Sequence, residues 1–346
     1  METENIYIMR EYQPIDTHAQ KEALINEFKG NLFEYLVGQL LSRHFKIEGD
    51  FVRSFGGEIR NQLTEYDHWL RVNEPNLIKY LPELAKNVCD SLLPYLPNKA
   101  DHIYVIGKSV AGPHSKKWAE ADIVIQDGDQ VFPISLKLCK AMAFVNTKSA
   151  GVKSFISQYF GNFSKSGFWQ NKVNEGVETR FQLMAQELHD RVGIEFFGRF
   201  DHRWSESGHS ELPGQLPSEL NKVVVNTYYD CIRDIYDALL SMYLEDKEAF
   251  CQSVLPLMGV TDLEIIQVTC FHKEIKTVKY RPAGVHIIRA KSMLEELSNV
   301  EILPLKEGIS SFEIKLRNFR LQIRIKPMNK FTSAAFKVNC SIKEIK

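Results

Sequence analysis

Asp122, Ser135 and Lys137 are the residues whose types and spacing most clearly indicate chemistry in this sequence. Asp122 lies in one apolar, β-branched run, residues 121–125, and the other two lie in a second run, residues 132–138. Because alternate residues of a strand point to the same side of a sheet, Ser135 and Lys137 share a face. An acid and a lysine on neighbouring buried strands cost desolvation free energy unless they pair or hold a metal ion.

The segment between the two runs, residues 126–130, has the composition of a turn. Its Asp-Gly pair is the strongest short-range signal of a β-hairpin. The sequence therefore predicts that the two runs pair as a hairpin, with the acid on one strand and the lysine on the next.

Composition sets the broad class of the protein. The 346 residues are enough for one large domain or two ordinary ones, and 44% hydrophobic and 25% charged residues are typical of globular proteins. The net charge of −1 means that any basic surface must be local. The six cysteines are scattered without zinc spacing, which predicts reduced thiols in a cytoplasmic protein. No signal peptide is evident, and no run approaches the roughly 20 apolar residues of a membrane span, so we expect no membrane contact.

A helix is expected over residues 21–45, where apolar residues recur every three or four positions. Glu34 lies among them. The simpler interpretation is a surface glutamate at the edge of the apolar stripe, and the alternative is a carboxylate that points into a site. Residues 58–98 predict further helical segments broken by prolines. A strand is expected over residues 102–107, followed by the lysine-containing loop 107–117, which is either solvated or in contact with phosphate.

After the hairpin, a helix is expected to begin following Gly151, with Lys148 and Lys153 on either side of its start. A helix N-terminus with lysines is a natural phosphate site, and two exposed lysines without a ligand are the alternative. Residues 164–220 show the least regular pattern, and we expect a long loop over residues 199–219. Another helical stretch follows.

The C-terminal region predicts strands over residues 263–271, 285–290, 312–316, 319–325 and 336–342, with Asn318 as a hairpin turn. From Glu313 onward there are nine basic and two acidic residues, a net charge of +7. Alternation within residues 319–326 predicts one apolar and one basic strand face. A solvated sheet face and a surface for DNA phosphates fit this pattern equally well.

The predicted order is a helix with Glu34, a strand with Asp122, a strand with Ser135 and Lys137, and a second helix. This order resembles the core of the PD-(D/E)xK nuclease superfamily. The chain resembles its type II restriction endonucleases over residues 28–163. Gly30-x-x-Phe33-Glu34 is similar to the glutamate motif of the first core helix. Asp122 is similar to the family's acid. Ser135-x-Lys137 is similar to a variant motif in which serine replaces the second acid.

Two departures from the family pattern bear on the metal ligands. Ala121, and not proline, precedes Asp122, and Ser135 is a poorer magnesium ligand than a carboxylate. The missing charge must come from elsewhere. Glu34 is the first candidate, and Glu120 is the second because it shares the face of Asp122 if the strand extends back.

The resemblance implies a mixed α/β (α+β) fold with a PD-(D/E)xK restriction-endonuclease-like core, a helical N-terminal region and a β-rich C-terminal region. It implies a helical region over residues 1–100 that carries the first core helix. The catalytic strands and helix would occupy residues 101–165. Residues 166–346 would form a helical and β-rich region for DNA recognition and dimerisation.

The implied activity is Mg²⁺-dependent, site-specific hydrolysis of phosphodiester bonds in double-stranded DNA. A hard cation neutralises the scissile phosphate and lowers the pKa of an attacking water. The expected catalytic residues are Asp122, Lys137, Glu34 and Ser135, with Lys137 orienting the water or stabilising the transition state. The expected metal ligands are Asp122, Glu34, the Leu136 carbonyl and, as the alternative acid, Glu120.

Eight basic residues are expected to contact DNA: Lys116, Lys117, Lys148, Lys153, Arg320, Arg324, Lys326 and Lys330. The resemblance also implies a homodimer that cuts both strands of a symmetric site, without a nucleotide cofactor. Three alternatives stay open. The first is a nuclease of the same fold without a defined target sequence. The second is a non-catalytic DNA-binding protein with a degenerate nuclease core. The third is a structural protein in which Asp122 and Lys137 form an ordinary ion pair.

Overall fold

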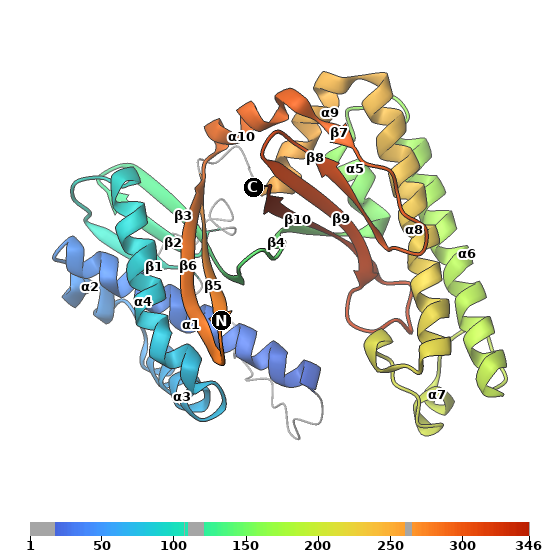
Figure 1. Cartoon of the computed structure of the whole chain (residues 1–346), viewed down its shortest axis with the longest axis horizontal. Coiled ribbons are helices and arrows are strands. Elements are labelled where there is room, and N and C mark those ends of the chain that lie inside the picture. The colour runs from blue at the N-terminus through green and yellow to red at the C-terminus, as the bar shows by residue number, and fades with distance from the viewer. Residues whose placement is uncertain (1–17, 107, 110–120, 260–264, 346) are drawn as a thin grey trace, which may run out of the picture. The chain divides into compact units, whose positions relative to one another are not determined.

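The computed structural model describes residues 18–106, 108–109, 121–259 and 265–345 (Figure 1). The chain forms two compact units. Unit 1 comprises Met1–Ala141 and Ile265–Ile287, and unit 2 comprises Met142–Glu264 and Ile288–Lys346. The chain therefore leaves unit 1, builds most of unit 2, returns to unit 1 for two strands, and ends in unit 2.

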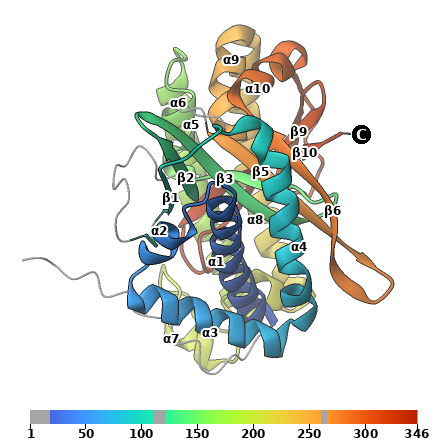
Figure 2. The same ribbon diagram turned by 90° about the vertical axis from the view of Figure 1, so that its left-hand side faces the viewer.

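Unit 1 is a mixed sheet with helices on it (Figure 2). Its five strands lie in the order β1-β2-β3-β5-β6. The strands β1, β2 and β3 are antiparallel neighbours, whereas β3 and β5 are parallel. Their bounds are β1 His102–Val105, β2 Ile123–Asp127, β3 Gln130–Lys140, β5 Ile266–Ile275 and β6 Val278–Ile288. The helices are α1 His18–His44, α2 Glu48–Arg53, α3 Gly57–Asn73, α4 Pro75–Leu92 and the 3-10 turn η1 Leu93–Tyr95.

Helix α1 confirms the helix expected over residues 21–45. It contacts β1 and β3, and α4 contacts β5, while α3 packs against both helices. Phe33, Val37 and Leu41 are buried in a core that they share with sheet residues such as Ile123 and Ile134. The spacing of four between these apolar residues puts them on one side of α1 and so fixes which side faces the sheet.

The predicted hairpin is confirmed. Strands β2 and β3 pair from Ile123 opposite Ile134 to Asp127 opposite Gln130. The turn has two residues, and its Gly128 has a φ of +57°, a left-handed conformation that glycine adopts without a Cβ clash. Its N–H donates to the Asp101 carboxylate over 2.8 Å. The turn therefore lies within the predicted segment, with Gly128 and Asp129 as its two residues and Asp127 in the last strand pair.

Unit 2 contains a second five-stranded sheet, which is antiparallel throughout, with the order β4-β10-β9-β8-β7. Its strands are β4 Val145–Gly151, β7 Glu301–Ile302, β8 Ser311–Lys315, β9 Phe319–Pro327 and β10 Phe336–Glu344. Two long helices, α6 Ser166–Val192 and α8 Ser218–Glu245, pack on each other, and α8 also contacts β8 and β9. Shorter elements are η3 Val152–Ser154, α5 Phe155–Tyr159, α7 His202–Glu206, η4 Pro213–Gln215, α9 Lys247–Val254, η5 Leu255–Met258, α10 Ala290–Glu296 and η6 Leu297–Asn299.

The expectation of irregular structure over residues 164–220 is wrong. Most of the first half of this segment is helix α6, whose buried side chains include Val173, Val177, Phe181 and Leu188. They recur at helical spacing, but exposed polar residues separate them and weaken the pattern. The expected loop over residues 199–219 contains the short helices α7 and η4, and it is packed against the rest of unit 2 through the buried indole of Trp204.

The mixed α/β class, the helical N-terminal region and the β-rich C-terminal region are as the sequence predicts. The division into units differs from the expected boundaries. Residues 142–165, which were expected to belong with the catalytic strands, lie in unit 2. The strands expected over residues 263–271 and 285–290 join the sheet of unit 1. Among the described residues, no helix combines the length and the apolar character needed to cross a membrane.

His272 on β5 gives unit 1 a specific dependence on pH. It lies opposite Lys140 on β3, with its ring 4.8 Å from that of Tyr280. Burial, reinforced by the charges of Lys29 and Lys140, lowers the pKa of His272 from 6.5 to about 4. The unfolded chain therefore takes up a proton at this histidine before the folded chain does, and the free energy of unfolding falls as pH decreases from 6.5 to about 4.

We expect His272→Gln to lose less stability than wild type over this pH range. The difference should be on the order of 1 kcal/mol, because the imidazole is partly solvated. Urea unfolding at neutral and mildly acidic pH measures it. Equal losses in the two proteins would show that His272 does not titrate differently on folding.

Candidate functional site

The main chain of Asp122 is fixed between two neighbouring strands of unit 1. Asp122 directly precedes β2, and its N–H donates to the carbonyl of Ile134 on β3 over 2.8 Å. Its own carbonyl accepts from the N–H of Ile106, just after β1, over 3.0 Å. Strand pairing on both sides therefore sets the direction of the Asp122 side chain.

Three groups of β3 converge on one oxygen of the Asp122 carboxylate. The Leu136 N–H donates to Oδ2 over 2.5 Å, and the Ser135 hydroxyl donates to it over 3.2 Å. The Nζ of Lys137 lies 3.6 Å from the same oxygen. Within the described ranges, no hydrogen bond or ion pair to the other oxygen, Oδ1, is found. The structure thus brings together Asp122, Ser135 and Lys137, as their spacing predicts, and leaves the Lys137 side chain 45% exposed.

Leu136 enters this cluster through its amide N–H, which orients the Asp122 carboxylate. The expectation that its carbonyl binds a metal stays a prediction.

Glu34 is also part of this charged cluster. Only 18% of its side chain is exposed, and its carboxylate forms an ion pair with Lys108. Burial raises the pKa of Glu34 above its ordinary value, and the negative charge of Asp122 raises it further. The positive charges of Lys108 and Lys137 act in the opposite direction and lower this pKa. The charges of Asp122 and Lys137 both affect Glu34, so we treat the two acids and two lysines as one candidate site.

Lys108 is a site residue that the sequence did not single out. It follows β1, and its N–H donates to the carbonyl of Val105 over 3.1 Å. The N–H of Ser109 donates to that same carbonyl, and Ser109 also forms a β-bridge with Phe55. The only sequence signal was the content of lysine in the loop 107–117. Nothing local in the sequence shows that this part of the chain folds back to helix α1.

Three further expected site residues, Glu120, Lys116 and Lys117, lie outside the described residues. Neither the alternative metal ligand nor this pair of DNA contacts is therefore placed.

The donors of this cluster suit a magnesium ion with an open coordination sphere. Within the part of the chain that the structure describes, no group of three or more His, Cys, Asp or Glu side chains is arranged to hold a metal. The oxygen donors are the carboxylates of Asp122 and Glu34 and the hydroxyl of Ser135. Mg²⁺ is commonly held by one or two carboxylates and keeps several waters, so this donor set fits it.

The two lysines of the expected phosphate site lie on different elements, and phosphate binding there stays a prediction. Lys148 lies within strand β4, opposite Cys340, and not beside a helix start. The helix does begin after Gly151, but only as the short elements η3 and α5. Lys153 forms an ion pair with Glu178 on α6. Sequence spacing placed both lysines near the start of the helix. Strand β4, however, extends to Gly151 and therefore includes Lys148.

Lys330 is likewise engaged by an acid. It forms an ion pair with Glu211, whose carbonyl also accepts the N–H of Phe331 over 3.1 Å. This lysine therefore fixes the segment that follows β9 against residue 211, a role that competes with the expected DNA contact.

The predicted two-faced strand is confirmed in β9. Leu321, Ile323 and Ile325 are buried, while the residues between them point to the opposite side. Strand β10 continues this side, because Lys337 pairs with Lys326 and Lys343 pairs with Arg320. We call the set Arg320, Arg324, Lys326, Lys337 and Lys343 the basic face.

The basic face carries charge that the described acids of unit 2 neutralise only in part. Arg320 pairs with Glu313 over 2.8 Å, but among the described residues no acid forms an ion pair with Arg324, Lys326 or Lys337. Burial, together with the charges of Lys337 and Arg324, lowers the pKa of Lys326. These three cations therefore lie close enough to repel one another, which favours the approach of an anion.

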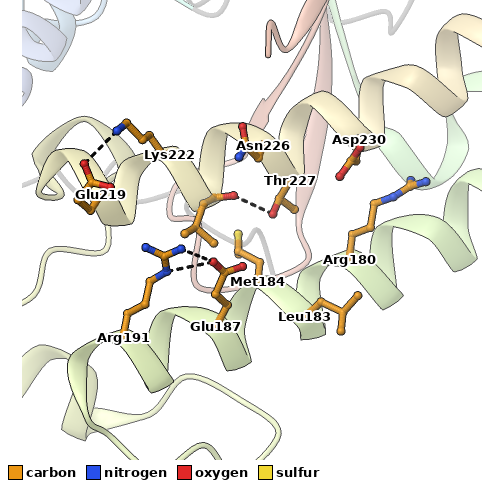
Figure 3. Close-up of a pocket in the computed structure, with 11 residues that line it drawn as sticks. Arg180, Leu183, Met184, Glu187, Arg191, Glu219, Lys222, Asn226, Thr227 and Asp230 are labelled. Carbon is orange, nitrogen blue, oxygen red and sulfur yellow. Dashed lines mark hydrogen bonds and ion pairs between the residues drawn. The ribbon is translucent and has the colours of Figure 1, made fainter. Parts of the chain in front are cut away.

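A pocket between α6 and α8 is lined by none of the residues of the basic face (Figure 3). It has a volume of about 380 Å³, and its charged side chains are three bases and three acids, Arg180, Arg191, Lys222, Glu187, Glu219 and Asp230. Two of these acids pair with bases of the same pocket, as the dashed lines in Figure 3 show. Because the charges balance within the pocket, they select no class of ligand.

The candidate site of unit 1 is therefore the cluster of Asp122, Ser135, Lys137, Glu34 and Lys108, and the candidate anion surface of unit 2 is the basic face. A scan against protein-family models, a search of curated proteins and a search of solved structures each return no match to this chain.

Proposed function

We propose that this protein is a Mg²⁺-dependent endonuclease that hydrolyses phosphodiester bonds of double-stranded DNA at a specific sequence, as type II restriction enzymes do. The observation that carries the proposal is the convergence of Ser135, the Leu136 N–H and Lys137 on Asp122. An acid held by the main chain, beside an exposed lysine on the next strand, supports this proposal because the acid can hold a metal ion and the lysine can contact a phosphate oxygen.

Asp122 and Glu34 are the residues that would hold the metal ion. Mg²⁺ bound there supplies positive charge for the scissile phosphate and a water of lowered pKa. The Leu136 N–H keeps the Asp122 carboxylate in one orientation, so little reorganisation is needed when the ion binds. Lys137, whose side chain is 45% exposed, is able to donate a hydrogen bond to the water or to a phosphate oxygen.

The topology of unit 1 supports the same proposal. Helix α1 packs on an antiparallel β1-β2-β3 meander, the order that the nuclease core requires. The departure is that the chain then builds unit 2 before it returns to pair β5 with β3. On this proposal, the part of unit 2 that follows β6 contributes DNA contacts through Arg320, Arg324 and Lys326. Homodimerisation and a cytoplasmic location stay predictions of the sequence.

Digestion of plasmid DNA by the purified protein tests the proposal, with Mg²⁺ in one reaction and EDTA in the other. Discrete fragments that require Mg²⁺ are expected, and sequencing their ends would give the target. A smear would instead indicate a nuclease without a defined site. A long genomic DNA contains many more candidate target sites than a plasmid. If such DNA stays intact under the same conditions, the result would contradict nuclease activity.

Two observations favour a second candidate, a DNA-binding protein without catalysis. Serine occupies the place of the second acid, and Glu34 is already paired with Lys108. In that case the protein would retard DNA on a gel equally well with Mg²⁺ and with EDTA, and it would leave all of the DNA uncut.

A further inference from the structure

The ion pair between Lys108 and Glu34 is largely removed from water. The two side chains are 16% and 18% exposed. Salt screens such a pair much less than it screens a pair on the surface. The ion pair between the Lys108 ammonium group and the Glu34 carboxylate is therefore stable at high salt concentration.

The main chain around Lys108 is anchored on both sides. The Val105 N–H donates to the Ser109 hydroxyl over 3.0 Å, and the Ser109 N–H donates back to the Val105 carbonyl over 3.0 Å. The Ser54 hydroxyl donates to that of Ser109 over 3.3 Å. Rotation of the flexible lysine side chain lets the ammonium group leave Glu34 while these hydrogen bonds stay in place.

The charges of the site balance as it stands. Asp122 and Glu34 are matched by Lys137 and Lys108, which pair with them in that order. A divalent cation that entered between the carboxylates would add two positive charges beside the Glu34 carboxylate, whose Oε2 is now in contact with Lys108. The cation and the ammonium of Lys108 therefore compete for Glu34.

We propose that Lys108 is a positioning residue that holds Glu34 in the metal-free protein and that a divalent cation displaces it when the site is loaded. The inference rests on the proposed function, because it takes Glu34 as a metal ligand. It adds a role that the nuclease resemblance does not contain, a built-in lysine counter-ion that weakens metal binding until the metal replaces it.

Binding of Mn²⁺ to the full-length Lys108→Met variant tests this proposal, with free Mn²⁺ measured by electron paramagnetic resonance. We expect the variant to bind Mn²⁺ about tenfold more tightly than wild type. The reason is that Mn²⁺ no longer has to break the charged hydrogen bond between Lys108 and Glu34, and a tenfold change in affinity matches the free energy of one such bond. Without metal the variant should melt at a lower temperature, because Glu34 loses its partner, and Mn²⁺ should raise its melting temperature more than that of wild type.

Lys99→Met is the matched control. Lys99 pairs with Asp127 at the far end of β2, and its side chain is 77% exposed. This variant should bind Mn²⁺ as wild type does. A second comparison keeps the test valid if Lys108→Met folds poorly: in a Glu34→Gln background, which removes the contested carboxylate, the effect of Lys108→Met on Mn²⁺ affinity should vanish.

The outcomes separate the two proposals. Wild-type protein that binds Mn²⁺ while Lys108→Met binds it with unchanged or lower affinity would overturn the role of Lys108 alone. A tightening that persists in the Glu34→Gln background would also overturn it. Wild-type protein that neither binds Mn²⁺ nor cuts DNA would overturn the proposed function itself.

Discussion

Replacement of Lys137 by alanine is expected to abolish DNA cleavage and to leave DNA binding intact. Lys137 lies 3.6 Å from Asp122 Oδ2 and is the more exposed member of this pair. A cation at this position stabilises charge that develops on the phosphate only during the reaction, so its loss should lower the cleavage rate by about 10³-fold. Single-turnover cleavage and gel-shift binding in Ca²⁺ measure the two effects separately.

Lys140→Ala is the control for this prediction. Lys140 lies on the same strand, is exposed, and is opposite His272, away from Asp122. It should cut at the wild-type rate. If Lys137→Ala also cut at that rate, the assignment of the catalytic lysine would be wrong, and the contact with Asp122 would be an ordinary ion pair.

Charge reversal of Arg324, Lys326 and Lys337 to glutamate is expected to weaken DNA binding by at least about 100-fold near 0.1 M salt. These three cations form no ion pair with a described acid, and two of them lower the pKa of the third. A phosphate backbone relieves this repulsion. The slope of log affinity against log salt should also fall by about 3, since each phosphate contact contributes about 0.9.

A second triple variant with the same change of charge controls for the global field. Lys165, Lys172 and Lys247 are exposed and lie at or on the helices of unit 2, not on its sheet. Fluorescence anisotropy with a labelled duplex compares the two variants across a salt series. Equal losses of affinity would mean that net charge governs binding and that the basic face has no special role.

Features encoded by neighbouring residues were predicted well. The hairpin depended on an Asp-Gly turn between two apolar runs, and β9 on strict alternation of apolar and polar residues. Both patterns need only local information, because strand geometry alone decides which residues share a face. Within the candidate site, Asp122, Ser135 and Lys137 belong to this class, since the register of a single hairpin brings them together.

Features encoded by distant residues were missed. The pair of Lys108 and Glu34 joins residues 74 positions apart, and no local pattern marks either as the partner of the other. The division into two units has the same origin, because β5 joins β3 only after the whole of residues 142–264. Helix α6 was missed for another reason: its buried stripe is narrow, and its many polar residues resemble those of a loop.

The return of the chain to β3 has a consequence for the order in which the protein is made. During synthesis, β3 carries Lys137 on a strand with one unpaired edge, because its partner residue on that side, Thr269, has not yet been added. Such an edge offers free backbone N–H and C=O groups to other chains. The strand that bears Lys137 therefore becomes an interior strand late, and closing so long a loop makes this a slow step of folding. We expect nascent chains that end before β5 to be prone to aggregation and inactive on DNA.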